Sequence, residues 1–211
     1  MSNFTVAVAK FVNEELERWG DGAGRETDAP YSSYVAEYWK VGLPIINRNG
    51  NTTEIGADGK SSRPPWSAAF VSYIMRKSGA GDEFLYSEAH GHYVIKAICA
   101  ANTNPIIAKF IGHHPAKYKP KVGDLISAER GYARNYNFQS AQDNYGPKPV
   151  PRGHFFSHSD IVVDVDAVAR TLKTVGGNVT PDTVAKKTWR LKQDGTLVQG
   201  ASLICVVECL L

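Results

Sequence analysis

The sequence predicts a single α+β domain over residues 1–211, in which a helical half comes first and an antiparallel sheet follows. Apolar side chains recur every three or four residues through much of residues 1–111, which is the period of an amphipathic helix. Within residues 120–211, short runs rich in β-branched residues alternate with turn residues, a pattern typical of strands. A chain of 211 residues can bury one core without disulfides, and no internal repeat divides it.

Two helices are expected in residues 1–63. The first repeats apolar side chains every four residues from Phe4 to Leu16, and the second carries an aromatic stripe from Tyr31 to Trp39. Residues 47–63 are polar, contain glycine and show no periodicity, so we expect a loop there.

Two further helices are expected in residues 64–111. Pro65 stands just before the clearest helical pattern, residues 66–77, and proline favours the first turn of a helix. Gly79 closes this pattern, as glycine commonly does at the end of a helix. Ser87 is a suitable N-cap for the helix that follows.

The second half is expected to form a sheet of five strands. Asp194-Gly195 favours a hairpin between the last two strands. Residues 129–155, between the first two strands, are rich in Tyr, Asn, Gln and Pro, and a loop of that length is usually functional or disordered. The expected strands are residues 124–128, 156–165, 171–175, 184–191 and 197–207.

The composition is that of an ordinary globular domain, with 43% hydrophobic and 21% charged residues. The net charge of +3 suits an approach to an anionic polymer but selects none. Because no basic stripe and no membrane-length apolar run is present, neither a nucleic acid nor a membrane is an expected partner. The first ten residues lack the pattern of a secretory signal, so synthesis in the cytoplasm is expected.

The cysteines and paired histidines do not predict a disulfide framework or a metal site. Cys99, Cys205 and Cys209 are odd in number and unrelated in spacing. His-x-His and His-His pairs begin at His90 and His113, and such pairs would suit zinc. No acidic or cysteine ligand lies at a companion spacing, and a two-residue spacing on a helix points the rings apart, so we expect neither metal nor cofactor.

Four short segments follow one another in an informative order. They are residues 65–72 (Pro-Trp-Ser-Ala-Ala-Phe-Val-Ser), 120–126 (Pro-Lys-Val-Gly-Asp-Leu-Ile), 158–163 (His-Ser-Asp-Ile-Val-Val) and 175–178 (Val-Gly-Gly-Asn). Each segment is weak evidence alone, but their order and the change from helices to a sheet make the combination informative. Together they resemble the papain-like bacterial cell-wall hydrolases of the NlpC and CHAP types, and within these a branch with Trp-Ser-Ala-Ala-Phe at the nucleophile helix.

This resemblance implies a papain-like fold, with the helical half packed on the antiparallel sheet, and hydrolysis of a peptidoglycan amide bond by an endopeptidase or N-acetylmuramoyl amidase. Ser67 stands where the relatives carry a nucleophilic cysteine, His158 where they carry the general base, and Asn178 where a polar residue orients that histidine. A nucleophile in the first turn of a helix lies at the positive end of the macrodipole, which favours an anion. Backbone N–H groups there can also stabilise an oxyanion.

The serine leaves three interpretations open, because a hydroxyl is far harder to ionise than a thiol. Ser67 is a working nucleophile assisted by His158, or an engineered replacement of cysteine that inactivates the enzyme. The third interpretation is a catalytically inactive wall-binding or interaction module on the same fold. Each residue also has a purely structural interpretation: Ser67 as a helix cap, His158 as a buried strand histidine and Asn178 as a turn residue.

Further side chains are expected near the cleft. His90 and Tyr93 lie one helical turn apart, as substrate contacts or as core residues. Asp160 shares a strand face with His158 and is either a supporting carboxylate or an ion-pair partner. The remaining candidates are Trp66 and three tyrosines of the long loop, Tyr132, Tyr136 and Tyr145.

Relatives of the branch include type VI secretion effectors that lack ordinary signal peptides. The resemblance therefore implies an antibacterial toxin that a specialised secretion system delivers to the periplasm of a target cell. Its expected partners are peptidoglycan, an immunity protein and the secretion apparatus. A papain-like enzyme acting on another amide, in a protein or a lipoyl group, is the alternative enzymatic interpretation.

Overall fold

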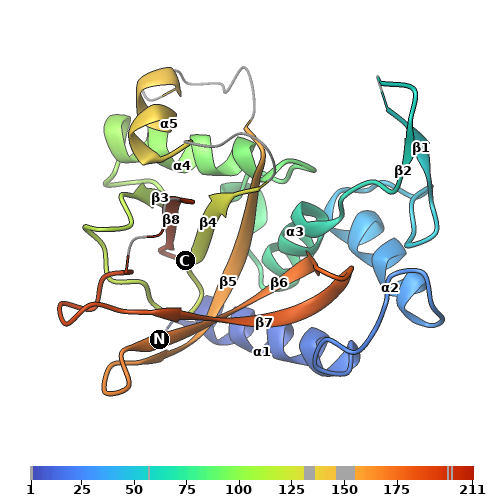
Figure 1. The fold of residues 1–211 in the computed structure, drawn as a ribbon. Helices are drawn as coiled ribbons and strands as arrows, with labels where there is room; N and C mark the ends of the chain where they lie inside the picture. Colours follow the sequence, from blue (N-terminus) through green and yellow to red (C-terminus); the bar gives the residue numbers. More distant parts are fainter. Residues whose placement is uncertain (1, 57, 131–135, 146–154, 199, 201) are drawn as a thin grey trace.

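The computed structural model describes the chain except residues 1, 57, 131–135, 146–154, 199 and 201. It shows a mixed architecture of a large antiparallel sheet and several helices, which confirms the α+β prediction at this level (Figure 1). No helix in the described part of the chain combines the length and hydropathy needed to cross a membrane. The helices are α1 (Asn3–Arg18), α2 (Tyr31–Glu37), the π-helical turn η1 (Tyr38–Gly42), α3 (Ser67–Lys77), the 3-10 turn η2 (Gly81–Glu83), α4 (His90–Thr103) and α5 (Phe138–Tyr145).

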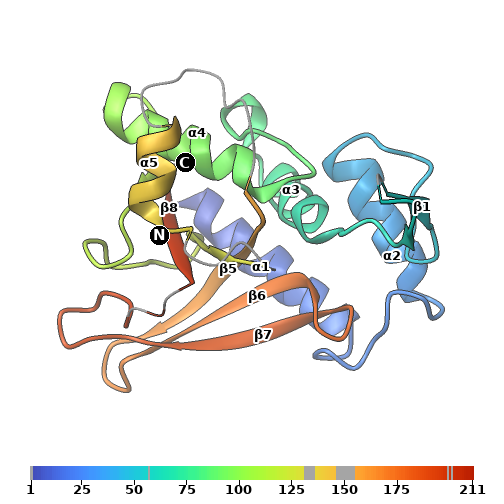
Figure 2. The same ribbon diagram turned by 45° about the horizontal axis from the view of Figure 1, so that its top comes forward.

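Six strands form the main sheet in the order β3-β8-β4-β5-β6-β7, and every neighbouring pair is antiparallel. Two short strands form a separate hairpin within the expected loop at residues 47–63. Figures 1 and 2 show this hairpin beside α2, with α3 between it and the main sheet. The strands are β1 (Glu54–Ile55), β2 (Ser61–Ser62), β3 (Phe110–His113), β4 (Leu125–Glu129), β5 (Ser157–Asp166), β6 (Thr171–Val179), β7 (Thr183–Arg190) and β8 (Leu203–Cys209).

The prediction that the last two strands pair as a hairpin is wrong, because β7 and β8 are not neighbours in the sheet. A single bridge, Leu191 to Leu197, closes the turn at Asp194-Gly195, and the chain then crosses to the other side of the sheet. There β8 lies between β3 and β4. Residues 203–207 are buried in succession, so β8 needs cover on both faces and cannot serve as the partner of the polar, largely exposed β7.

Besides the β1–β2 hairpin and the short turn η2, two further elements were not anticipated. β3 follows the helical segment and is only four residues long, too short for its alternation to stand out in the sequence. α5 occupies residues 138–145 within the long segment expected to be a loop. Its helical pattern is weak in sequence, because its eight residues include Gln, Ser, Asp and Asn.

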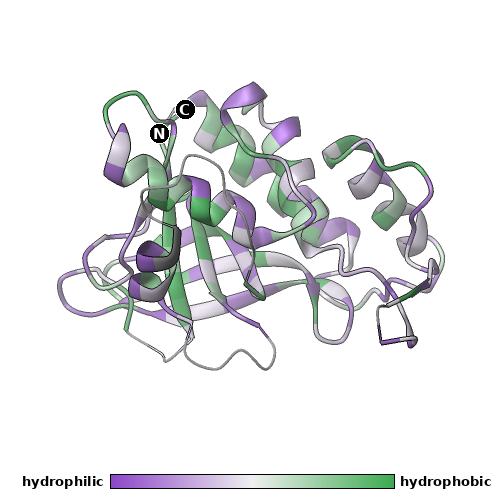
Figure 3. Ribbon diagram, turned by 90° about the horizontal axis from the view of Figure 1, so that it is seen from above, coloured by the Kyte–Doolittle hydropathy of each residue, from purple (hydrophilic) through white to green (hydrophobic). Residues whose placement is uncertain are grey.

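The core lies between the sheet and its covering helices. α3 packs on β5 and β6, while α1 packs against α3, β5 and β7. Figure 3 shows hydrophobic segments running through the central strands and the helices over them. Gly177 on β6 permits the close approach of α3, because a Cβ there would lie 2.6 Å from the Phe70 side chain and 2.7 Å from the Trp66 ring.

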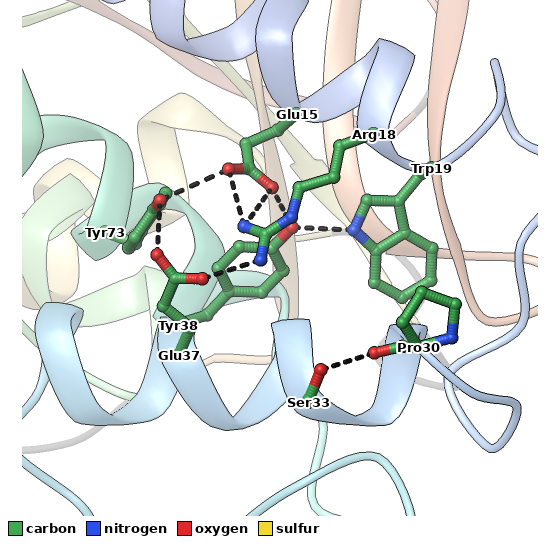
Figure 4. Close-up of polar contacts among 8 residues, drawn as sticks. All are labelled: Glu15, Arg18, Trp19, Pro30, Ser33, Glu37, Tyr38 and Tyr73. Carbon is green, nitrogen blue, oxygen red and sulfur yellow. Dashed lines mark hydrogen bonds and ion pairs between the residues drawn. The ribbon is translucent and has the colours of Figure 1, made fainter.

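A largely buried polar network joins α1, α2, η1 and α3 (Figure 4). Glu15 accepts hydrogen bonds from the hydroxyls of Tyr38 and Tyr73 and pairs with Arg18 at 3.2 Å. Arg18 also donates to Glu37 at 2.8 Å, and Tyr73 donates to Glu37 at 3.0 Å. These contacts hold the helices that frame the start of α3.

Asp124, directly before β4, connects the turn that precedes β4 to the end of β8. Its carboxylate accepts hydrogen bonds from the backbone N–H groups of Lys121 at 2.8 Å and Cys209 at 3.1 Å. It therefore closes a turn and fastens the end of β8. Burial raises the pKa of this carboxyl to about 6, against the opposing effect of the two N–H groups.

Asp124→Asn should remove a fall in stability between pH 4 and 6. Because the folded pKa lies above the ordinary value of 3.8, the folded protein binds more protons in this range and loses stability as the pH rises. A difference of two pKa units corresponds to on the order of 2–3 kcal/mol in the free energy of unfolding. Urea titrations at pH 4, 5 and 6 would compare the two proteins. The asparagine amide can accept from only one of the two N–H groups, so the variant should be less stable at every pH. Equal slopes of the free energy of unfolding against pH in the two proteins would contradict the prediction.

Candidate active site

A cleft of about 920 Å³ opens where the starts of α3 and α4 meet the β1–β2 hairpin and the residues leading into β5. Such a volume is typical of sites for small molecules or short peptide segments. Ser67 and His90, each the first residue of its helix, both line it. The other lining residues are Glu26, Thr53, Ser61, Ser62, Arg63, Pro64, Pro65, Glu88, Ala89, Arg130, Phe155, Phe156, Ser157, Asn178 and Asp182.

Ser67 lies where the sequence predicted it, in the first turn of a helix. Its side chain lines the cleft although the residue is only 3% exposed. Trp66, the N-cap residue, provides no side-chain hydrogen bond to the first turn of α3. Backbone N–H groups at such a helix start carry a partial positive charge and can bind an oxyanion.

The hydroxyl of Ser67 contacts His90, not His158. The distance from Ser67 Oγ to His90 Nε2 is 2.7 Å. The other ring nitrogen, Nδ1, is hydrogen-bonded to the hydroxyl of Tyr93 one turn later, and Tyr93 also hydrogen-bonds Ser159. These contacts suit a ring that donates from Nδ1 to Tyr93 and accepts the Ser67 proton at Nε2.

His90 is suited to act as a neutral base. It is 5% exposed, and burial holds its pKa well below 6.5, with further lowering by the charges of His158 and Arg130. Burial raises the pKa of Tyr93, so this phenol stays protonated. The neutral ring therefore keeps a lone pair directed at the serine hydroxyl.

His158 lies close by but already has a partner on each ring nitrogen. Its ring centroid is 5.3 Å from that of His90. Nε2 contacts Asp160 at 2.8 Å, and Nδ1 contacts the guanidinium of Arg130 at 3.2 Å. The first glycine of the Gly-Gly pair, Gly176, leaves room for this arrangement, because a Cβ there would overlap the Asp160 carboxylate.

The expected role of Asn178 as the residue that orients His158 is wrong. Asp160 and Arg130 occupy the two ring nitrogens, so the Asn178 side chain has none to bind. Asn178 adopts a φ of 56° at an irregularity between β6 and β7, a conformation that asparagine tolerates. Its backbone carbonyl accepts a hydrogen bond from Arg130 at 3.0 Å, so Asn178 has a structural role at a bulge within β6, and the expected turn is also not observed.

A comparison with protein families matches residues 27–207 to a bacterial family, DUF2272, described as "Uncharacterized protein conserved in bacteria". The chain belongs to this family. The match contains every residue that lines the cleft except Glu26. No curated protein and no solved structure matches the chain.

The other candidates in this DUF2272 domain fall into three groups. Trp66 is 1% exposed, stacks on Trp19 at 5.1 Å and donates to Glu26, so it supports the start of α3 from beneath instead of contacting substrate. Tyr136 stacks on Phe155 at 4.3 Å, and it is Phe155 that lines the cleft. Tyr132 and the side chain of Tyr145 lie outside what the structure describes.

The paired histidines point apart. His90 contacts Ser67, whereas His92 Nδ1 contacts the Ser87 hydroxyl at 2.8 Å. Within the described ranges, no three His, Cys, Asp or Glu side chains gather as a metal ion would require. Arg130 was missed by the sequence analysis, because a single cation directly after a strand belongs to no motif that would mark it as part of the site.

Ser67→Cys provides a direct test of this geometry. The positive end of α3 should lower the thiol pKa and the cleft should admit the reagent, so iodoacetamide should alkylate Cys at position 67 about tenfold faster at pH 7 than an ordinary buried thiol. Burial raises the pKa of the Cys205 and Cys209 thiols, so these two native cysteines should be alkylated only slowly. Ser72→Cys, buried in the same helix, is the matched control. Mass spectrometry of labelled peptides gives both rates, and equal rates would show that position 67 does not open into the cleft.

Proposed function

We propose that this chain is a papain-like hydrolase that cuts an amide bond of peptidoglycan through an acyl-enzyme on Ser67. The observation that carries the proposal is the 2.7 Å contact between the Ser67 hydroxyl and a neutral histidine at the start of an uncapped helix. The order of the four sequence segments and the helices packed on an antiparallel sheet support the papain-like assignment. The choice of peptidoglycan rests on the resemblance in sequence.

The reaction assigns the base to His90 instead of His158. As Ser67 Oγ bonds to the amide carbonyl carbon, His90 Nε2 takes the hydroxyl proton, and N–H groups at the start of α3 stabilise the oxyanion. Collapse breaks the C–N bond, and His90 returns the proton to the leaving amine. Water then attacks the ester carbonyl carbon while His90 accepts a proton from it, and the C–Oγ bond breaks as His90 returns that proton to Ser67 Oγ.

The buried base explains why a serine suits this cleft. A thiolate nucleophile depends on a stable imidazolium partner, which burial of His90 disfavours. A serine needs a neutral base that is charged only during the reaction. The His158 ring, 5.3 Å from that of His90 and paired with Asp160, is one cause of the lowered pKa of His90 and so helps to keep this base neutral before the reaction.

The biological setting forms part of the proposal. The chain acts as an antibacterial effector that a secretion system carries to the periplasm of a target cell, where peptidoglycan is accessible. An immunity protein would then protect the producing cell.

The deciding experiment incubates the purified chain and its Ser67→Ala variant with purified sacculi, followed by mass spectrometry of the soluble products. The original chain should release fragments with one new carboxyl and one new amine, whose masses identify the bond, and Ser67→Ala should release none. Binding to sacculi without release by either protein would favour the non-catalytic wall-binding module. Release by both would exclude Ser67 as the nucleophile.

A further inference from the structure

The cleft contains one cation whose charge is not balanced by a carboxylate in the described part of the chain. Arg63 pairs with Glu26 and, at 3.5 Å, with Asp182. Glu88 pairs with Arg48 at 2.6 Å. Arg130 also lines the cleft, and none of the ion pairs among the described residues includes it.

Arg130 is held in a defined position by a backbone carbonyl group and an imidazole ring. Nη2 donates to the carbonyl oxygen of Asn178 at 3.0 Å, and Nη1 lies 3.2 Å from His158 Nδ1. A guanidinium has five N–H donors in a planar fork, so these contacts leave further donors for a ligand. The residue is exposed, and the cleft that it lines also contains Ser67 and His90.

We propose that Arg130 binds a carboxylate of the substrate beside the scissile amide, so that the enzyme selects peptides with a free carboxyl group at that position. The position of this carboxylate beside a cleaved bond rests on the proposed amide hydrolysis, but its binding to Arg130 does not require catalysis. Guanidinium groups bind carboxylates through paired, charge-assisted hydrogen bonds. Stem peptides of peptidoglycan carry a carboxyl group at the second residue, either free or as the amide. Arg130 would distinguish these two forms, because only the free carboxylate is charged.

Binding of a carboxylate at Arg130 would also strengthen the base. The positive charge of Arg130 is one cause of the lowered pKa of His90. A bound carboxylate cancels that charge and makes His90 a better proton acceptor. The correct substrate would thus increase the reactivity of Ser67, whereas an amidated substrate would leave His90 a weaker base.

The binding experiment uses Ser67→Ala protein, which cannot turn over substrate, and two synthetic N-acetylmuramoyl tripeptides that differ only in a carboxylate or carboxamide on the second residue. Calorimetry should give a Kd at least about tenfold lower for the carboxylate, the usual size of a charge-assisted hydrogen bond. Adding Arg130→Gln should abolish this preference. Arg63→Gln, which lines the same cleft but is already paired, is the matched control and should keep it.

A second measurement separates recognition from positioning of His158. In protein with Ser67 intact, Arg130→Gln should raise KM for the carboxylate peptide about tenfold and leave KM for the carboxamide peptide unchanged. A merely structural role would affect both peptides equally and overturn the proposal. Equal Kd values for the two peptides, no binding of either, or a preference that survives Arg130→Gln would also overturn it. Selective binding without hydrolysis by the Ser67 protein would retain the carboxylate site and reject the proposed reaction.

Discussion

Replacing His90 with alanine should lower kcat/KM for peptidoglycan fragments by about 10²–10⁴-fold, the usual contribution of a general base. His90 is the group whose ring nitrogen contacts the Ser67 hydroxyl, and no described residue besides His90 has a hydrogen bond to that hydroxyl in the structure. His92→Ala is the matched control, since its ring lies two residues later and contacts Ser87 instead. Release of soluble product by each variant, with circular dichroism to verify folding, would be compared with the original chain.

His158→Ala tests whether His158, instead of His90, is the general base. The His158 ring lies beside that of His90, whereas the Ser67 hydroxyl contacts His90, so the loss of His158 should lower activity less than the loss of His90 does. If His158→Ala abolishes hydrolysis while His90→Ala remains active, the base is His158, and the observed serine contact is not the reacting one.

The pH profile offers an independent check on His90. The base must be neutral to accept a proton, and burial holds the pKa of His90 well below 6.5. The original chain should therefore keep its kcat/KM as the pH falls through 6.5 and lose it only at lower pH. An acid limb at or above pH 6.5 would point to an exposed histidine.

Replacing Glu15 with alanine should destabilise the fold by about 3 kcal/mol or more. The carboxylate is nearly inaccessible and accepts from two tyrosine hydroxyls while pairing with Arg18 (Figure 4). Its removal leaves the Tyr38 hydroxyl without an acceptor in the core. Arg18 retains Glu37, which limits the loss.

Glu14→Ala is the matched control, one residue away on the same helix. Glu14 is about half exposed and pairs only loosely with Lys10, at 3.8 Å, so its loss should change stability by less than about 0.5 kcal/mol. Urea unfolding of both variants gives the free energies, with the slopes checked for equality. Similar values for the two variants would mean that the network contributes no more than a surface ion pair. Glu15→Gln, which keeps an acceptor for one tyrosine, should fall between them.

The sequence alone determined most of the local structure and the position of Ser67. The four-residue spacing from Phe4 to Leu16 and the helix after Pro65 correspond to α1 and α3. Four of the five expected strands lie within a few residues of their predicted bounds, and the fifth starts later than expected. Helical periodicity and the preference of proline for the first turn depend on neighbours in the chain, so they can be read without knowledge of the fold.

The tertiary structure alone decided which side chains of the candidate site contact one another. His158 belongs to the sequence segment that resembles a hydrolase, yet Ser67 contacts His90, because the first residues of α3 and α4 meet at the same cleft. The partners of Arg130 depend likewise on how β4, β5 and β6 meet. These contacts join residues 23 to 48 positions apart in the chain and depend on packing of a whole core, which no local pattern of residues specifies.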